Sequence, residues 1–373
     1  MEAEDRFIIK RLANLPMPMV VLVSLVSMIG VVMLYSAAQG SLEPWAGRHF
    51  TRFLVGFICM ITVATIDIRF WFRNAYIIYV FALAFLAMVE VMGFIGMGAQ
   101  RWVNIAGVNF QPSEIMKIAV VLALARYFHS LHLNNIQKLS ILVIPGILVI
   151  VPVVLILKQP NLGTAVVTAM VAVAIFFMSG INIRKFVIAG IAGGACLPVI
   201  WNYMHDYQKK RVLTFLDPEA DPLGAGYNII QSKIAIGSGG IFGKGFLQGS
   251  QSQLSFLPEK QTDFIFTMLT EEFGLIGGLG IIIIYASIII LGIRIAVQCD
   301  SHFGKLAAFG IVTAMFMHVF INMAMSMGMI PVVGVPLPLL SYGGSNLIAT
   351  LIGIGFVLNA HVHRETHVER ALT

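Results

Sequence analysis

Residues 140–157 read SILVIPGILVIVPVVLIL, a run of apolar residues without a single charge. A membrane-spanning helix needs about 20 mostly apolar residues, because the hydrocarbon core of a bilayer is about 30 Å thick. Nine further segments have the same character, roughly 19–38, 50–67, 76–94, 112–129, 163–180, 184–202, 264–293, 305–329 and 339–360. The sequence therefore predicts an all-α integral membrane protein with about ten transmembrane helices, forming one domain over residues 1–373.

The amino-acid composition also indicates an integral membrane protein. Hydrophobic residues make up 58% of the chain and charged residues only 11%, whereas soluble domains carry about 25% charged residues. The net charge of +6 comes from basic residues placed between apolar runs, so it does not predict a nucleic-acid partner. Cys59 and Cys196 lie in apolar runs and Cys299 in a short loop, without metal-binding or disulfide spacing.

Orientation follows from the lysines and arginines, which favour the cytoplasmic side of a membrane. With the N-terminus inside, the inner connections carry most of them: Arg6, Lys10, Arg11, Arg69, Arg73, Arg126, Lys138, Arg184, Lys185, Arg294, Lys305, Arg364 and Arg370. The outer side has Arg48, Arg52, Arg101, Lys117 and Lys158. Both termini are thus predicted to be cytoplasmic, with a large periplasmic loop, 203–263, between helices seven and eight. The distinctive polar residues gather in the outer segments, which predicts chemistry on that face.

The first polar candidate is the helix start at 111–117. Pro112 suits a first helical position, and Glu114 then falls in the first turn, where a carboxylate is favoured by the helix dipole. Lys117 follows at i+3 on the same face. Two interpretations are open. The pair is either a local ion pair or part of the lining of a water-filled cavity, since ionisable residues inside membranes are usually functional.

The long outer loop offers a basic cluster, Lys209, Lys210 and Arg211, and a predicted short helix over 228–237. Its glycines between Gly237 and Gly249 do not match nucleotide-binding patterns. They either allow sharp turns or contact substrate directly.

Asp263 is the strongest catalytic candidate, because it stands where the loop meets a membrane helix. It is either a helix cap or a general base at the rim of a cavity of low dielectric constant, where its pKa would be raised. Glu271 and Glu272 lie deeper in that helix, and Glu90 is a further buried acid.

Two other polar groups lie near the end of the chain. His318 and Asn322, one turn apart, are predicted to form hydrogen bonds between helices. Residues 331–338 contain three prolines and precede Ser341. They are interpreted as a re-entrant segment below the site or as a helix-breaking linker.

Taken together, the motifs resemble those of the SEDS family (shape, elongation, division, sporulation) of cell-wall polymerases, nearest to its elongation branch. The resemblance covers nearly the whole chain and rests on 98–102 (GAQRW), 110–114 (FQPSE), 205–208 (HDYQ), 216–219 (LDPE), 221–227 (DPLGAGY), 231–239 (QSKIAIGSG), 262–266 (TDFIF), 334–338 (GVPLP) and 341–345 (SYGGS).

The resemblance implies a ten-span fold in the cytoplasmic (inner) membrane and peptidoglycan glycosyltransferase activity on lipid II at the periplasmic face. The position of Asp263 matches the family's essential acidic residue, proposed as the base, and Glu114 and Lys117 match positions that line the same cavity. A class B penicillin-binding protein, a transpeptidase, is the implied partner within the rod-shape elongation complex.

A lipid-linked pyrophosphate needs cations and polar groups near the outer surface. The predicted substrate-binding residues are Arg48, Arg101, Gln111, Glu114, Lys117, Gln159, Lys209, Lys210, Arg211 and Ser341. No cofactor is identified. A divalent cation such as Mg²⁺ or Mn²⁺ is compatible with this chemistry. The sequence does not show a set of ligands for it, so no metal site is predicted.

One position departs from the family pattern: the usual Gln-Pro-Asp-Leu-Gly-Thr is here Gln159-Pro-Asn161-Leu-Gly-Thr164. Asn161 is therefore predicted to have a structural or capping role. Two alternatives to the polymerase remain, a lipid II flippase or other transporter, and a non-catalytic scaffold. Polar residues on one face only, without paired interrupted helices, disfavour transport.

Overall fold

Ten long helices follow the predicted segments in order. The computed structural model describes residues 11–92, 94–96, 99–105, 108–131, 137–203, 206–220, 226–254 and 256–369. Within this part of the chain the long helices are α2 (Met17–Ala37), α3 (Ala46–Thr65), α4 (Ile68–Met92), α5 (Pro112–Ser130), α6 (Leu139–Lys158), α7 (Leu162–Met178), α8 (Ile183–Tyr203), α12 (Ile265–Gln298), α13 (His302–Ser326) and α14 (Gly344–Val362). Six of them, α2, α4, α6, α12, α13 and α14, are long and apolar enough to cross a membrane. The number of ten spans stays a prediction.

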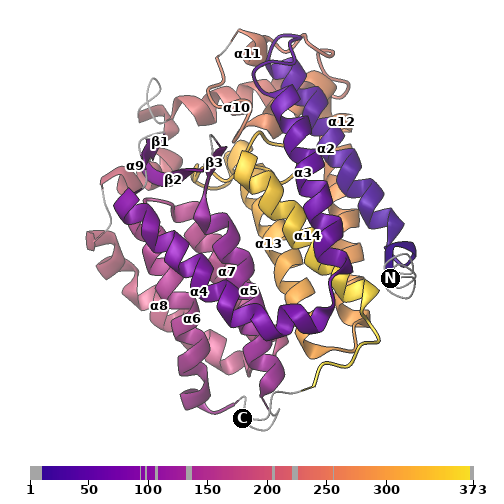
Figure 1. Ribbon diagram of the computed structural model, residues 1–373. Helices are drawn as coiled ribbons and strands as arrows, with labels where there is room; N and C mark the ends of the chain where they lie inside the picture. Colours follow the sequence, from indigo (N-terminus) through magenta and orange to yellow (C-terminus); the bar gives the residue numbers. More distant parts are fainter. Residues whose placement is uncertain are drawn as a thin grey trace.

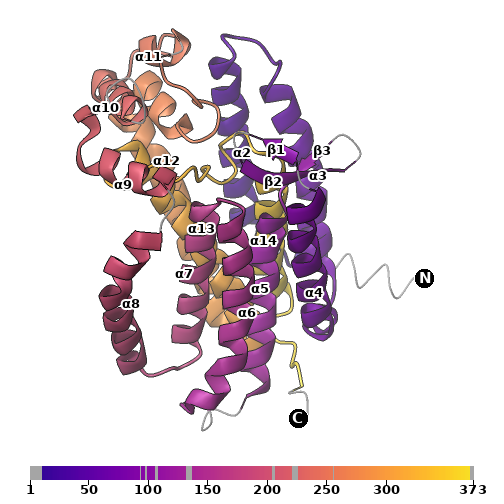
Figure 2. The same ribbon diagram turned by 90° about the vertical axis from the view of Figure 1, so that its left-hand side faces the viewer.

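The bundle is built around α5, whose side chains are buried along most of its length between α4, α7 and α13. Helix α14 lies along α3 (Figure 1). Glycines allow this close approach, as small residues do in other membrane helix pairs. A Cβ atom at Gly355 of α14 would lie 2.8 Å from the carbonyl oxygen of Met60 in α3. Helix α8 stands apart at the edge of the bundle, with most of its described side chains exposed (Figure 2).

A small antiparallel sheet corrects the all-α prediction. Strands β1 (Phe94–Gly96), β2 (Ala99–Ile105) and β3 (Val108–Phe110) pair in the order β1-β2-β3. Phe94 is opposite Trp102, and Val103 is opposite Phe110. The predicted helices 76–94 and 112–129 leave the segment 95–111 without a predicted element, because its apolar and aromatic runs are too short to predict strands by themselves.

The outer loop folds into short helices at the same end of the bundle as the sheet (Figure 1). They are α9 (Asp206–Leu216), the 3₁₀ helix η2 (Pro218–Ala220), α10 (Tyr227–Gly239) and α11 (Ser250–Gln253). Helix α10 confirms the helix predicted over 228–237. The end of the bundle that carries the sheet and α9–α11 is called the loop end below.

Helix α12 is broken at Gly274, which has φ 65° and ψ −161°. The segment 240–245 fills the break. The N–H groups of Lys244 and Gly245 donate to the carbonyl oxygens of Glu271 and Glu272 at 3.0 Å each. On the far side of the break, Leu275 N donates to Gly240 O at 2.9 Å and Ile276 N to Ile241 O at 3.2 Å. The loop thus supplies the hydrogen bonds that the helix loses, as the interior of a membrane protein requires.

Close packing against this break explains why the loop is rich in glycine. Gly243 has φ +81°, and a Cβ atom there would lie 2.1 Å from Glu272 O. A Cβ atom at Gly239 would lie 2.2 Å from Thr270 O. Of the two interpretations of these glycines, the structure supports sharp turns and backbone packing.

Residues 331–343, which connect α13 to α14 near the loop end, have no regular secondary structure apart from a turn at 338–340 (Figure 1). Side chains from several helices satisfy the polar backbone groups of this segment. Asn322 Nδ2 donates to Val335 O at 2.7 Å, Tyr285 Oη to Pro338 O at 2.6 Å, and His49 Nε2 to Leu339 O at 3.1 Å. The predicted helix over 339–360 therefore begins only at Gly344, because 339–343 belong to this irregular segment.

We expect Gly243→Ala to destabilise the protein strongly. A left-handed conformation alone costs a non-glycine residue about 1–2 kcal/mol, and the new methyl group would collide with the backbone of Glu272. The measurement is thermal unfolding of the detergent-solubilised protein, with Gly237→Ala as control because no atom lies within 4 Å of a Cβ placed there. Equal melting temperatures for the two variants would contradict this account of the break.

Candidate functional site

Asp263 lies at the loop end, immediately before α12. Phe264 occupies the N-cap position of that helix, and no side chain caps it, so the interpretation of Asp263 as a cap is wrong. Its main-chain oxygen accepts a hydrogen bond from Asn322 Nδ2 at 2.9 Å. A Cβ atom at Gly334 would lie 3.4 Å from Asp263 Oδ2, which shows that the carboxylate faces the backbone of the irregular segment 331–343.

Ser341 braces the chain just before Asp263. Its hydroxyl donates to Thr262 O at 2.6 Å and accepts from Leu337 N at 2.8 Å. Tyr342 N donates to Gln261 O at 2.8 Å. Ser341 was predicted to bind substrate, but its hydroxyl is buried and engaged in these two bonds. In this structure it positions the backbone next to the candidate base.

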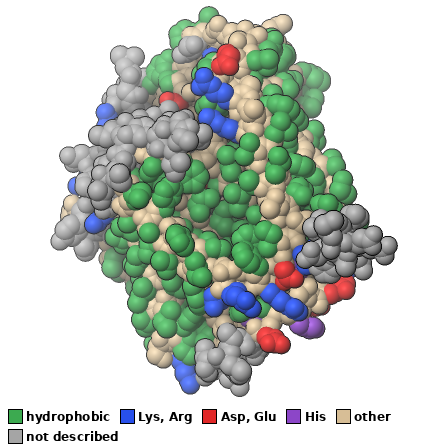
Figure 3. Space-filling model, viewed as in Figure 1, with side chains coloured by type: hydrophobic (Ala, Val, Ile, Leu, Met, Phe, Trp, Pro, Cys, Tyr) green, Lys and Arg blue, Asp and Glu red, His purple; other side chains and the backbone are tan. Residues whose placement is uncertain are grey.

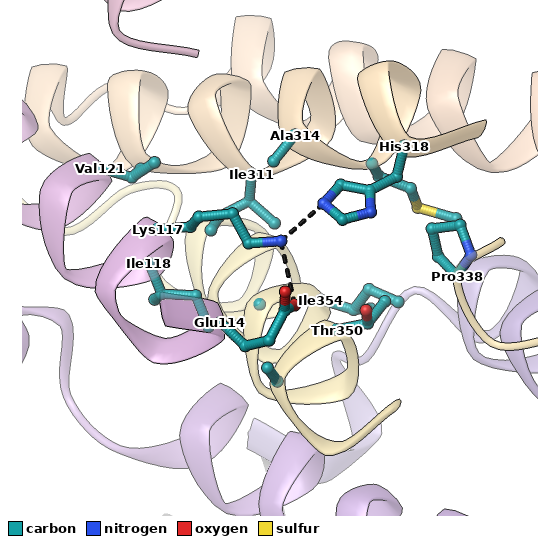
Figure 4. Close-up of a pocket in the computed structure, with 13 residues that line it drawn as sticks. Glu114, Lys117, Ile118, Val121, Ile311, Ala314, His318, Pro338, Thr350 and Ile354 are labelled. Atoms are coloured by element: carbon teal, nitrogen blue, oxygen red, sulfur yellow. Dashed lines mark hydrogen bonds and ion pairs between the residues drawn. The ribbon is translucent and has the colours of Figure 1, made fainter. Parts of the chain in front are cut away.

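A second polar group lies between α5, α13 and α14. Lys117 Nζ is 3.0 Å from Glu114 Oε2 and 2.6 Å from His318 Nε2 (Figure 4). Asn346 Nδ2 also donates to Glu114 Oε2, at 3.0 Å. A protonated lysine can only donate, so Nε2 of His318 is the acceptor and its ring proton is on Nδ1. The predicted i+3 ion pair is confirmed, and a third charge-stabilising partner, His318, comes from a different helix.

This cluster is enclosed. Glu114 and Lys117 are only 4% and 8% exposed, and the cavity that they line has a volume of about 50 Å³. Its other walls are mainly apolar, for example Ile118, Val121 and Ile354 (Figure 4). Such a space can hold water molecules but not a sugar. Substrate binding by Glu114 and Lys117 therefore stays a prediction, and it requires a conformation more open than this one.

The two polar groups are joined through α13. His318 contacts Lys117, and Asn322, one turn further along, holds Asp263 and Val335. Pro338, three residues after Val335 in the irregular segment, lines the cavity beside His318. The prediction of a hydrogen bond between helices is confirmed for His318, which contacts Lys117 of α5. Asn322 instead donates to main-chain oxygens of two residues outside the helices, Asp263 and Val335.

The deeper acids of α12 have structural partners. Glu271 accepts from Lys244 Nζ at 2.9 Å and from the main-chain N–H groups of Gln251 and Ser252 at 2.8 and 3.1 Å. It thereby ties the glycine-rich loop and the start of α11 to the bundle.

Glu272 points to a different neighbour. It accepts from the hydroxyl of Ser36 in α2 and, at 3.5 Å, from Gln253 Nε2. Two adjacent acids that could have marked an ion pathway thus anchor the loop end. The side chain of Glu90 falls outside the described part of the structure.

Several predicted substrate residues are placed differently from expectation. Gln159 is buried, and its Nε2 donates to Leu86 O at 2.9 Å, so it links α6 to α4. Arg48 is exposed and forms a long ion pair with Glu43, at 3.7 Å. Gln111 is half-buried at the N-cap of α5 without a capping bond.

The remaining predicted cations lie on the loop-end elements. Lys209 is half-buried and Lys210 exposed on α9. The side chains of Arg101, in β2, and Arg211, in α9, fall outside the described part, as do residues 98, 205 and 221–225 of the quoted motifs. The structure therefore does not bring these residues and Asp263 into one described cluster.

Asn161 caps α7, as predicted. Its Oδ1 accepts from Thr164 N at 3.4 Å, and its Nδ2 lies 3.5 Å from Ser113 Oγ in α5. An amide can both accept and donate at this position, which explains its fit without a charge.

Sequence reasoning missed three residues near the site. Arg52 lies over the ring of Tyr342, with 5.0 Å between its Cζ and the ring centroid. Asn346, described above, had one available signal: it is a polar residue in the first turn of an otherwise apolar helix. Lys260 is buried close to Asp263 in sequence, and burial lowers the pKa of its ammonium group, an effect partly opposed by the Glu272 carboxylate. Within the described residues, no three His, Cys, Asp or Glu side chains come together in a way that could hold a metal ion.

We expect Lys117→Met to destabilise the protein more than the double change Glu114→Gln with Lys117→Met. Removing one partner of a buried ion pair costs about 3–5 kcal/mol because the remaining charge stays buried, whereas removing both charges costs less. Thermal unfolding in detergent would measure this, with Glu43→Gln with Arg48→Gln as a control on an exposed pair. Additive effects of the two buried changes would contradict the coupling.

Residues 16–366 match the family model FtsW/RodA/SpoVE, described as cell cycle protein. The chain is 42% identical over 350 residues to the peptidoglycan glycosyltransferase MrdB of Escherichia coli K12, covering 93% of this chain and 94% of that protein. It is 34% identical over 360 residues to the stage V sporulation protein E of Bacillus subtilis 168, with 91% and 95% covered.

Solved structures of similar proteins have the same fold as this chain. One chain from a study of how a peptidoglycan synthase complex coordinates polymerization and crosslinking superposes with a TM-score of 0.82 at 32% identity, covering 95% of this chain and 99% of that one. The rod shape determining protein RodA of Thermus thermophilus superposes with a TM-score of 0.71 at 27% identity, covering 95% and 98%. The motifs, the fold and these matches lead to one conclusion: the chain belongs to the FtsW/RodA/SpoVE family of cell cycle proteins, the SEDS family that its motifs resemble.

Proposed function

We propose that the protein is a peptidoglycan glycosyltransferase that polymerises lipid II into glycan strands during cell elongation. The observation that carries this proposal is the position of Asp263. It is held at the loop end by Asn322 and faces Gly334, in a chain whose relatives are named peptidoglycan glycosyltransferases.

In the proposed reaction, Asp263 takes the proton from the 4-hydroxyl of the acceptor sugar. The hydroxyl oxygen forms a bond to the anomeric carbon of the lipid-linked donor. The bond from that carbon to the phosphate oxygen breaks, and undecaprenyl pyrophosphate leaves with the electron pair. A positioned general base contributes about 10²–10⁴-fold to such a reaction. A divalent cation bridging the pyrophosphate and a carboxylate stays a prediction.

The proposed topology places ten spans in the cytoplasmic membrane, both termini in the cytoplasm and Asp263 at the periplasmic face. The distribution of charge supports it. The arginines at the end opposite the loop end include Arg73 and Arg126, which are linked by a bond from Arg126 Nη1 to Arg73 O at 2.7 Å. Basic residues at one end of a helical bundle favour a cytoplasmic position for that end.

The proposed partner is a class B penicillin-binding protein, whose transpeptidase activity would crosslink the new strands within the rod-shape elongation complex. In support, one of the similar chains comes from a structure described as a peptidoglycan synthase complex. The alternative, a lipid II flippase or other transporter, has less support now that Glu271 and Glu272 are engaged in structural contacts.

The test is polymerisation of purified lipid II in detergent by the protein with its transpeptidase partner, whose own activity is blocked by a β-lactam. We expect wild-type protein to produce glycan strands on a gel and Asp263→Asn to lose at least about 10²-fold in rate. Glu43→Gln, a change to an exposed acid at the loop end, should leave the rate unchanged.

Each outcome decides a different point. An undiminished rate for Asp263→Asn, with melting temperature and partner binding intact, would remove Asp263 as the base. If wild-type protein makes no strands but moves lipid II across vesicle membranes, the transporter alternative replaces the polymerase. Strands that appear only when a second polymerase is added would identify a scaffold.

A second prediction concerns Asn161. We expect Asn161→Asp to change the polymerisation rate by less than about twofold, because aspartate and asparagine are equally good N-caps. The same gel assay measures it, with the melting temperature as a check on folding. A many-fold increase in rate would show that the missing carboxylate limits catalysis.

A further inference from the structure

A polar cavity lies at the end of the bundle opposite Asp263. It has a volume of about 540 Å³ and is lined by residues before α2, at the α3–α4 junction and at the end of α14: Arg11, Asn14, Asp67, Arg69, His361, Val362, His363, Arg364, Glu365 and Thr366. Asp300 N, which follows α12, donates to Arg364 O at 3.0 Å. The full length of α12 therefore separates this cavity from Asp263, and the proposed reaction does not use it.

The first feature of the cavity is its excess of cations. Three arginines and two acids line it. Asp67 is engaged with Arg11 Nη2 at 3.1 Å and caps α4 by accepting from Arg69 N at 2.9 Å. Glu365 forms an exposed pair with Arg364 Nε at 3.3 Å. Arg11 Nη1 also donates to Thr65 O at 2.7 Å, and Arg69 Nη2 to His367 O at 3.4 Å. Each guanidinium group has five donors and suits phosphoryl oxygens, and the three arginines carry one more charge than the two carboxylates neutralise.

The second feature is a set of imidazole nitrogens without partners among the described residues. His363 is only 4% exposed, and its Nδ1 lies 3.1 Å from Asn359 O. A carbonyl can only accept, so Nδ1 carries the proton and Nε2 presents a lone pair. Nε2 of His363 and Nδ1 of His361 are both buried and unpartnered. Burial of the ring and the nearby Arg11 lower the pKa of His363, which keeps it neutral. A buried acceptor of this kind calls for a donor from a ligand.

The third feature is an apolar surface beside the cavity. Met17, Val21 and Leu25 of α2, spaced at i, i+4 and i+8, are 58%, 56% and 44% exposed. Met17, the first residue of this stripe, lies three residues after Asn14 of the cavity. Figure 3 shows basic, acidic and histidine side chains gathered at this end of the molecule, next to a hydrophobic surface. A ligand with a polar head and an apolar tail would match both surfaces.

We propose that this cavity binds a phosphodiester head group that carries hydroxyl or ammonium donors, supplied by a phospholipid of the adjacent leaflet. The arginines would bind the phosphoryl oxygens, and Nε2 of His363 would accept from one of the donors. The acyl chains would lie along the stripe on α2. A soluble phosphate ester shares the head-group chemistry but leaves the stripe empty.

Phosphatidylglycerol is the probe, because its head group combines a negative phosphate with two hydroxyl donors. The protein is reconstituted in phosphatidylcholine nanodiscs with and without phosphatidylglycerol, and its melting temperature is measured. We expect phosphatidylglycerol to raise Tm by at least about 3 °C. Phosphatidylcholine, whose head group has no N–H or O–H donor, provides the baseline. Glycerol 3-phosphate added to the baseline discs tests the soluble source.

The decisive variant is Arg364→Gln. Its side chain is 49% exposed and pairs with the adjacent Glu365, so folding is not at risk. Arg184→Gln is the matched control, an exposed arginine at the start of α8 and outside the cavity. Lipid retained in native mass spectrometry should fall about threefold or more for Arg364→Gln and stay unchanged for Arg184→Gln.

The outcomes separate the possibilities. A Tm rise that Arg364→Gln abolishes and Arg184→Gln retains supports the site. An equal rise with glycerol 3-phosphate supports the phosphate chemistry and overturns the membrane source. An equal loss in both variants would show a general attraction of anionic lipid to the basic end and overturn the proposal, as would the absence of any rise.

Discussion

The segment 331–343 imposes the constraint on which the rest of this structure depends. Much of it is buried among helices although it has no helical hydrogen bonds of its own, and each unpaired backbone group there would cost several kcal/mol. The groups that satisfy it are single side chains from separate helices: His49 of α3, Tyr285 of α12 and Asn322 of α13. These helices must therefore hold their relative positions for the segment to exist. Asp263 is placed by the same set of contacts, because Asn322 holds its backbone and Gly334 lies beside its carboxylate.

The break in α12 follows the same rule with a different solution. Here main-chain groups of the segment 240–245 form the hydrogen bonds that the helix lacks on both sides of Gly274. Side chains reinforce it, since Glu271 binds Lys244 and the start of α11 while Glu272 reaches α2. The part of α12 between Asp263 and Gly274 is thereby hydrogen-bonded to the outer loop as well as packed in the bundle. A partner that moved this loop would act directly on α12, which begins two residues after the candidate base.

The two buried charges of α5 each have several partners. Lys117 contacts both Glu114 and His318, and Glu114 also accepts from Asn346. These ion pairs and hydrogen bonds offset the free-energy cost of burying the two charges. The small cavity beside the cluster shows that the described conformation is closed around it. A lipid-linked sugar needs far more space, so a functional cycle that uses Glu114 or Lys117 directly must open the region between α5, α13 and α14.

The sequence by itself determined the features that depend on composition or on neighbours along the chain. Apolar runs predicted all ten long helices, because a membrane demands about 20 apolar residues wherever a helix crosses it. Spacing predicted the Glu114–Lys117 pair and the capping role of Asn161, since i+3 pairs and N-caps are local. Only the tertiary structure decided that Phe264 rather than Asp263 stands at the N-cap. It also decided that Lys117 meets His318, 201 residues away, and that Gln159 and Ser341 bind backbone. Those contacts join residues far apart in the chain, and their energies depend on how the helices pack, which no local pattern encodes.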